Sequence, residues 1–233
     1  TEPGELALFI DEAQLSLLEA QMQQAGYLRA DQMAGAFQML RSYDLLWSRM
    51  VNEYLLGDRA PMNDLMAWNA DATRMPAKMH SQYLRRLFLN NDLSQGRYPV
   101  GGRPVHLGDL HAPTFMVGTV TDHVAPWRSV FKLHQLSPAE ITFVLTSGGH
   151  NAGIVNPPGH PHRHYQALTR ATGGHPLAPD AWLAAAPEVQ GSWWPAWQAW
   201  LQAHSGTKVP PPRTGTRAYP AIADAPGSYV LTP

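Results

Sequence analysis

The chain has 233 residues, a formal net charge of −1 and only 15% charged residues, so its composition favours neither nucleic acid nor an anionic membrane surface as a partner. It contains no cysteine, which excludes disulfides, thiolate metal sites and a cysteine nucleophile within these residues. No apolar run is long enough to span a membrane, and the first residues lack the features of a secretion signal. We therefore expect a soluble protein without a membrane span that is not itself secreted and acts on a small or nearly neutral molecule.

The first part of the chain shows the three- and four-residue spacing of apolar side chains that is typical of helices. This spacing predicts helices over residues 6–22, 43–56, 64–71 and 78–93. Ser42 is a candidate N-cap for the second of them, and Gly57 can supply the left-handed residue that ends it. The first 95 residues are therefore predicted to be mainly helical.

The pattern changes after Pro99. Residues 113–120 and 141–147 form two short runs rich in β-branched and aromatic residues, which predicts two strands. Between them Pro126 suits the first turn of a helix and Pro138 follows its end. A strand, a helix and a strand in this order predict parallel strands joined by a crossover helix. Because two parallel strands need neighbours, we expect part of the sheet to be missing from the chain.

The last part of the chain combines tryptophans and prolines. Residues 179–189 and 192–204 predict two short helices, and Trp193, Trp197 and Trp200 are spaced to share one helical face that packs on the sheet. Residues 208–233 are proline-rich and irregular, which indicates a strap lying over the surface.

Titratable residues follow both predicted strands. Asp122 lies two residues beyond the first strand, and His150 follows the second in "SGGHNAG". Because the carboxyl ends of parallel strands share one edge of a sheet, these two side chains should lie close together. An acid followed by a histidine is the chain order of α/β-hydrolase triads, in which the acid orients the imidazole. The alternative is that both residues are loop polars that cap or form turns.

A triad also needs a nucleophile, which should precede the acid in the chain. The G-x-S-x-G elbow that exposes such a nucleophile is absent from this sequence. The serines that precede Asp122 lie in helical or loop contexts without flanking glycines, and they are Ser16, Ser42, Ser48, Ser81 and Ser94. We therefore expect the nucleophile and the rest of the sheet to lie upstream of Thr1.

Several segments resemble a known family in order and without large gaps. The helical segments "QMLRSYDLLWSRMVNEYLLGDRAPMNDLMAWNADATRMP" and "SQYLRRLFLNNDL" precede "VGTVTDHVAPW", "SGGHNAGIVNPP" and "GSWWPAWQAWLQ". Together they resemble the C-terminal half of class I polyhydroxyalkanoate synthases over nearly all of residues 1–205. The resemblance implies the C-terminal part of an α/β-hydrolase fold, preceded by a mainly helical cap subdomain. It suggests a cap over 1–98, the core over 99–205 and the strap over 206–233.

The resemblance also implies an activity. Such synthases are acyltransferases that condense (R)-3-hydroxyacyl-CoA units into polyester and release coenzyme A, using a cysteine with a histidine and an acid. They imply a homodimer at the surface of polyester storage granules in the cytoplasm, with the growing polyester chain as a partner and no cofactor or metal. Because the cysteine-bearing N-terminal half is missing from this chain, we expect the chain to be inactive alone.

Site residues carry over from the family position by position. His150 matches the general base, and Asp122 matches the catalytic aspartate, which either orients the histidine or activates the hydroxyl of the incoming unit. His123 is either a supporting or a structural residue. Tyr83 and Trp68 match cap residues near the active site and the dimer contact respectively, with plain packing as the alternative.

Two other functions fit the same features. An α/β-hydrolase esterase or polyester depolymerase would share Asp122 and His150 but would use serine as its nucleophile. A non-catalytic granule-binding or dimerisation module is the third interpretation. The histidines of "GHPHRHYQ", His160, His162 and His164, could bind a metal if the segment were a strand, but its prolines favour an exposed loop.

Overall fold

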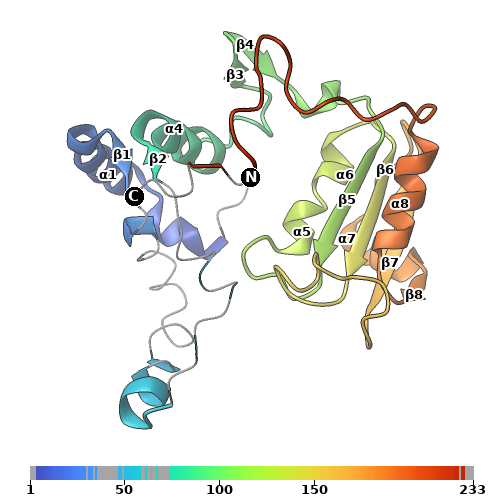
Figure 1. Ribbon diagram of the computed structural model, residues 1–233, viewed down its shortest axis with the longest axis horizontal. Helices are drawn as coiled ribbons and strands as arrows, with labels where there is room; N and C mark the ends of the chain where they lie inside the picture. Colours follow the sequence, from blue (N-terminus) through green and yellow to red (C-terminus); the bar gives the residue numbers. More distant parts are fainter. Residues whose placement is uncertain are drawn as a thin grey trace. The chain divides into compact units, whose positions relative to one another are not determined.

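The computed structural model describes residues 4–29, 31–33, 35, 47–48, 50–58, 61, 64, 67, 74–225 and 227–228 (Figure 1). The chain divides into two compact units, Thr1–Trp193 and Trp194–Pro233. Among the described residues, no helix is long and apolar enough to cross a membrane.

The helical structure predicted for the first residues is confirmed, but it forms two helices instead of one. The predicted helix over 6–22 is a 3-10 helix, η1 (Gly4–Phe9), followed by α1 (Glu12–Ala25). The break occurs because Asp11 is the N-cap of α1 and its carboxylate accepts the backbone N–H of Gln14 at 2.7 Å. Gly26 ends α1 with a left-handed φ of 79°.

The remaining predicted helices are present in part. The π-helix η3 (Met50–Leu55) falls within the predicted 43–56, and Gly57 follows it with a φ of 73°. The predicted 78–93 helix is α4 (Ala77–Gln82) continued by the π-helix η4 (Tyr83–Leu89). Ser42, Trp68 and most of 64–71 lie outside the described residues.

An ion pair and a short ladder join α1 to α4 and η4. Arg85 donates to both carboxylate oxygens of Glu19 at 2.7 and 2.9 Å, and the Ser81 hydroxyl donates to the same group. The hydrogen bonds from Arg85 and then Ser81 lower the pKa of Glu19 from 4.5 to about 2. Nearby, β1 (Tyr27–Leu28) pairs antiparallel with β2 (Met75–Pro76).

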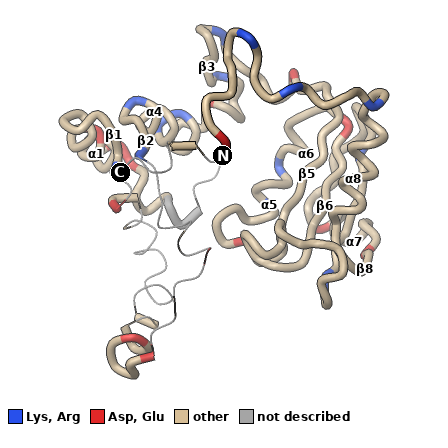
Figure 2. Tube along the Cα trace, in the orientation of Figure 1, with Lys and Arg blue, Asp and Glu red and all other residues tan. Residues whose placement is uncertain are grey.

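The first unit also contains a four-stranded sheet in the order β5-β6-β7-β8. Strands β5 (Thr114–Thr119) and β6 (Ile141–Thr146) are parallel, as predicted, and carry no charged residue (Figure 2). Their connection contains two short helices, α5 (Trp127–Val130) and α6 (Leu133–Leu136), instead of the single predicted one.

The other two strands were not expected from the sequence. Strand β7 (His164–Arg170) pairs antiparallel with β6, and β8 (Glu188–Gln190) pairs antiparallel with β7. The predicted helix over 179–189 is shorter, since α7 (Pro179–Ala185) ends before β8. Strand β6 therefore has neighbours on both sides within the chain, β5 and β7, which the sequence did not predict. Within the described part of the chain, no strand pairs with the other edge of β5.

The hydrophobic core lies on one face of this sheet. Side chains of β6 alternate, so Ile141, Phe143 and Leu145 point to the face covered by Phe131 and by Trp182 of α7. Phe143 lies between these two aromatic rings, with centroid distances of 5.0 and 4.9 Å. On the opposite face, Val144 and Thr146 of β6 are also fully buried.

A hairpin joins β3 (Tyr98–Val100) to β4 (Arg103–Val105) through two left-handed glycines, and the 3-10 helix η5 (Leu107–Asp109) follows it. In the second unit α8 (Trp194–Ala203) is followed by described residues without helix or strand, as the prolines of this segment predicted. Trp193 precedes α8, so it does not share a helical face with Trp197 and Trp200.

Candidate active site

Asp122 and His150 meet at the carboxyl edge of the two parallel strands. Asp122 follows β5 and His150 follows β6, and because the strands are parallel both residues leave the sheet at the same edge. The Nδ1 atom of His150 lies 2.9 Å from Oδ2 and 3.1 Å from Oδ1 of Asp122. The structure thus brings together the two side chains that the sequence predicted to be neighbours.

The Asp122 carboxylate is held by its own loop. Its Oδ1 accepts the backbone N–H groups of Val124 and Ala125, both at 2.8 Å, and its side chain is only 7% exposed. Burial by itself raises the pKa of Asp122, but the hydrogen bonds from Ala125, His150 and Val124 outweigh it. The pKa therefore lies below the ordinary value of 3.8, and Asp122 is ionised at neutral pH.

An ionised Asp122 determines which nitrogen of His150 carries the proton. A carboxylate only accepts hydrogen bonds, so a neutral His150 must donate from Nδ1, which leaves Nε2 as a proton acceptor. The His150 side chain is 45% exposed, in contrast to that of Asp122. This arrangement presents a base at the surface of the sheet edge, backed by a buried acid.

Glycine geometry brings the His150 loop close to the Asp122 loop. Gly148 has a left-handed φ of 109°, which glycine adopts without strain, and its carbonyl accepts the Thr121 N–H at 3.1 Å. Gly149, the next residue, has no left-handed φ. Gly153 lies so close to β5 that a Cβ atom there would be 2.5 Å from Cγ2 of Thr119.

Both loops also expose apolar side chains. Val120 and Val124 are exposed in the Asp122 loop, and Ile154 and Val155 are exposed in the His150 loop. Exposed apolar groups on both loops make this edge of the sheet suited to contact with an apolar molecule or with another part of a protein.

The supporting residues predicted from the sequence are placed differently. His123 is exposed in the same loop as Asp122. Tyr83 belongs to η4, where its ring packs edge-on against Phe88 at 5.3 Å and is 41% exposed. Trp68 lies outside the described residues. The functional roles of these three residues remain predictions.

The histidines considered as metal ligands do not lie on one strand. His160 and His162 are in an exposed turn, where His162 has a left-handed φ of 59°. His164, predicted to be in the loop, is instead the first residue of β7. Across the part of the chain that the structure describes, no three His, Cys, Asp or Glu side chains gather as a metal site would require.

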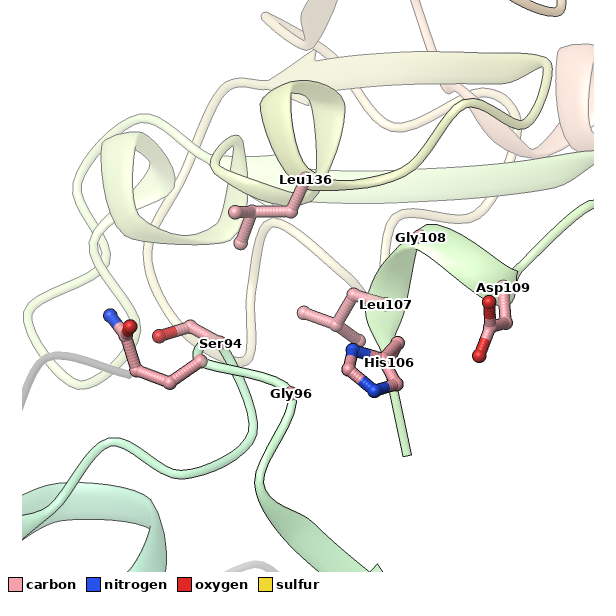
Figure 3. A pocket seen from close by; sticks show the side chains of 8 residues that line it. Ser94, Gly96, His106, Leu107, Gly108, Asp109 and Leu136 are labelled. Carbon is pink, nitrogen blue, oxygen red and sulfur yellow. The ribbon is translucent and has the colours of Figure 1, made fainter. Parts of the chain in front are cut away.

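A hollow of about 440 Å³ lies at the other end of the sheet (Figure 3). Its lining includes Gly96, His106 and Asp109 from the segment before β5, and Leu136 from the end of α6. These segments precede the strands, whereas Asp122 and His150 follow them. The hollow is thus separate from the pair, and it is open to solvent, with Leu107 and Leu136 among its apolar lining residues.

Residues beyond β8 also contact the His150 loop, and the sequence interpretation missed them. The Trp193 indole N–H donates to the carbonyl of Gly153 at 3.0 Å, and the Ser192 hydroxyl donates to the carbonyl of Asn156. The "GSWW" segment was a visible signal, but helical spacing assigned its first tryptophan to a helix face.

Comparison with known proteins identifies relatives along the whole chain. No protein-family model matches it. It is 44% identical over 233 residues to the poly(3-hydroxyalkanoate) polymerase subunit PhaC of Rhizobium etli and 44% over 232 residues to a poly(3-hydroxyalkanoate) polymerase of Methylorubrum extorquens. It is 37% identical over 236 residues to the polymerase subunit PhaC of Cupriavidus necator.

These matches cover 98–99% of this chain but only 36–39% of each relative. The chain therefore spans less than half the length of the curated relatives it matches. The resemblance carried by its motifs is confirmed: over nearly its whole length, this chain is homologous to part of the poly(3-hydroxyalkanoate) polymerases.

Proposed function

We propose that this chain is the C-terminal part of a polyhydroxyalkanoate synthase and supplies the aspartate and histidine of a Cys-His-Asp triad. The synthase polymerises (R)-3-hydroxyacyl-CoA into polyester and releases coenzyme A. The observation that carries the proposal is the 2.9 Å contact between His150 and Asp122, found in a chain that is 44% identical to a polymerase. The sequence contains no cysteine, so the nucleophile comes from outside these 233 residues.

The first step is the transfer of an acyl group to the cysteine. His150 takes the thiol proton through Nε2, and the sulphur forms a bond to the acyl carbon of the thioester. The bond between that carbon and the sulphur of coenzyme A breaks, and coenzyme A leaves as a thiol with the proton returned by His150. Asp122 stabilises the imidazolium that exists between the two proton transfers.

The second step extends the polyester. The hydroxyl of another 3-hydroxyacyl unit attacks the acyl carbon on the cysteine and forms an ester, while its proton passes through His150 to the departing thiolate. Asp122 orients His150 in this route; in the alternative route Asp122 accepts the hydroxyl proton in place of His150, and the departing thiolate receives it from there. The exposed valine and isoleucine side chains of the Asp122 and His150 loops are suited to the aliphatic units of such a substrate.

The family resemblance extends the proposal to the whole protein. Residues 1–98 form a cap, 99–205 belong to an α/β-hydrolase core and 206–233 form a strap. The synthase acts as a homodimer in the cytoplasm, at the surface of polyester granules. Trp68 and Tyr83 of the cap, and His123 beside Asp122, support the site.

Measuring coenzyme A release from (R)-3-hydroxybutyryl-CoA tests the proposal. The 233-residue chain alone should release no more thiol than a sample without protein. The same chain, joined behind the remaining N-terminal part of the Rhizobium etli polymerase, should release coenzyme A and form polyester. Release by the isolated chain would contradict the division of the triad, and release of the free hydroxy acid without polyester would indicate a hydrolase.

Single substitutions in the joined polymerase assign the roles. His150→Gln should lower the rate of coenzyme A release by about 100- to 10,000-fold, the usual contribution of a general base. His160→Gln is the matched control, since His160 is an exposed histidine of the next turn and should leave the rate unchanged. Equal losses in the two variants would contradict the role of His150.

A further inference from the structure

We infer that Ser192 and Trp193 are positioning residues that hold the His150 loop against the strand leading to Asp122. The inference rests on the proposed function, because its consequence for catalysis requires His150 to be the base. Together these two residues are called the bracket below.

The bracket contacts the His150 loop at two carbonyl groups. Trp193 donates its indole N–H to Gly153 at 3.0 Å, and Ser192 donates its hydroxyl to Asn156. Both acceptors follow His150 in the same loop, within six residues of it. The donors lie about 40 residues further along the chain, so these hydrogen bonds are tertiary contacts.

The bracket also contacts the strand that carries Asp122. The Trp193 ring stacks on Phe115 of β5, with a centroid distance of 6.2 Å and an interplanar angle of 27°. Phe115 and Thr119 lie on the same face of β5, because side chains alternate along a strand. Trp193 thus touches the strand that leads to Asp122 with its ring and the His150 loop with its nitrogen.

A short turn connects Gly153, which Trp193 contacts, to the backbone of His150. The N–H of Gly153 donates to the carbonyl of Gly149 at 2.9 Å, which closes a turn around His150. The position of Gly153 therefore sets the position of the backbone on both sides of the imidazole. The side chain of His150 is 45% exposed, so surrounding side chains restrain it less than its backbone does.

Burial makes the two hydrogen bonds hard to replace. Trp193 is 6% exposed and Ser192 is 8% exposed, and the Asn156 side chain beside them is fully buried. Removing one of these donors leaves the carbonyl of Gly153 or Asn156 without this hydrogen bond. The equilibrium then shifts from the closed loop toward a conformation in which the carbonyl reaches water. The expected shift in the population of the closed loop is about 3- to 10-fold for each hydrogen bond.

The tautomer of His150 reports this population directly. With Asp122 in place, neutral His150 carries its proton on Nδ1, which nitrogen NMR spectroscopy distinguishes from protonation on Nε2. Trp193→Phe keeps a ring on Phe115 but removes the donor to Gly153. In the 233-residue chain this variant should lower the ratio of the Nδ1-protonated to the Nε2-protonated form of His150 by about 3- to 10-fold.

Trp197→Phe is the matched control, because Trp197 lies in α8 and is 42% exposed. It should leave the His150 signal unchanged. An unchanged signal in Trp193→Phe, or an equal change in both variants, would overturn the role of the bracket. A wild-type His150 without the Nδ1 proton would instead refute the proposed Asp–His pair itself, so the two failures are distinguishable.

A second pair of variants covers the case in which Trp193→Phe fails to fold. Ser192→Ala removes the donor to Asn156, whereas Ser192→Thr keeps a hydroxyl at the same position. The alanine variant should lower the Nδ1 signal and the threonine variant should restore it. In the joined polymerase, Ser192→Ala should lower kcat by about 3- to 10-fold and leave KM unchanged. Equal behaviour of the two variants would overturn the inference.

Discussion

Replacing Gly153 with alanine tests how closely the His150 loop must approach β5. A Cβ atom at this position would lie 2.5 Å from Cγ2 of Thr119 and 3.0 Å from the carbonyl oxygen of Gly149. Carbon atoms in contact are normally about 3.5–4.0 Å apart, so the loop or Thr119 must move by about 1 Å. Thr119 is 1% exposed and packed in the sheet, so the loop is the part that moves.

This displacement has a cost in stability and a consequence for the site. Crowding of this kind destabilises a protein by about 1–3 kcal/mol, which for a chain of this size lowers Tm by several degrees. The contact between His150 Nδ1 and Asp122 is 2.9 Å, and a shift of about 1 Å takes it beyond hydrogen-bonding distance. We expect Gly153→Ala to lower both Tm, followed by circular dichroism, and the Nδ1 signal of His150 in NMR spectra.

Two further variants separate crowding from a general effect of alanine. Gly206→Ala is the matched control, because a Cβ atom there meets nothing within 4 Å and the backbone is not left-handed. Adding Thr119→Ser to Gly153→Ala removes the nearest methyl group and should recover part of both losses. If Gly153→Ala kept the Tm and the His150 signal of the wild type, the argument from close approach would be refuted.

Three other substitutions probe charges and buried hydrogen bonds. Because the pKa of folded Asp122 lies below its ordinary value of 3.8, ionised Asp122 stabilises the fold above about pH 4 and this contribution is lost as pH falls through the lowered pKa. Asp122→Asn should therefore destabilise the chain at neutral pH, and the difference in unfolding free energy measured in urea should shrink below pH 3.8; a constant difference would contradict this. Glu19→Gln should cost about 1 kcal/mol, since its pairing with Arg85 is partly exposed and screened, and the loss should diminish in about 1 M salt. Arg170→Met should cost about 3 kcal/mol in the same measurement, because the buried guanidinium donates to three backbone carbonyls, and a loss below about 1 kcal/mol would count against this role.

The two parallel strands and the Asp–His pair could be predicted from the sequence because their signals are local. Residues 113–120 and 141–147 were predicted as strands. No end of β5 or β6 differs from these limits by more than one residue. Both are uncharged runs rich in β-branched and aromatic residues. Once the strands were parallel, the shared carboxyl edge placed Asp122 beside His150 without further information.

Strands β7 and β8 could not be predicted in the same way, because their pairing partners define them. The segment "HYQALTR" mixes polar and apolar residues and follows a turn with several prolines, which favours a loop. It becomes a strand because β6 offers a complete row of backbone groups along its free edge. Strand β8 has three exposed residues and depends on β7 in turn.

Trp193, one of the two bracket residues, shows in the same way that a local sequence pattern does not predict a contact with distant residues. Spacing in the sequence placed Trp193 on one helical face with Trp197 and Trp200, yet α8 begins at Trp194. Trp193 is instead drawn to Phe115 and Gly153, which lie 78 and 40 residues earlier in the chain. No local pattern specifies contacts over such separations, because they depend on which faces of the sheet remain uncovered.

Local contacts position Asp122, whereas tertiary contacts position His150. Asp122 accepts hydrogen bonds from Val124 and Ala125, two and three residues away, so its own turn fixes the acid. The backbone around His150 is instead fixed by Gly153, whose partners come from β5 and from Trp193. A buried, ionised acid held by its own loop needs little from the rest of the fold, whereas an exposed base needs distant residues to point it at that acid. The orientation of His150 is therefore the part of this site that depends most on how the whole sheet is assembled.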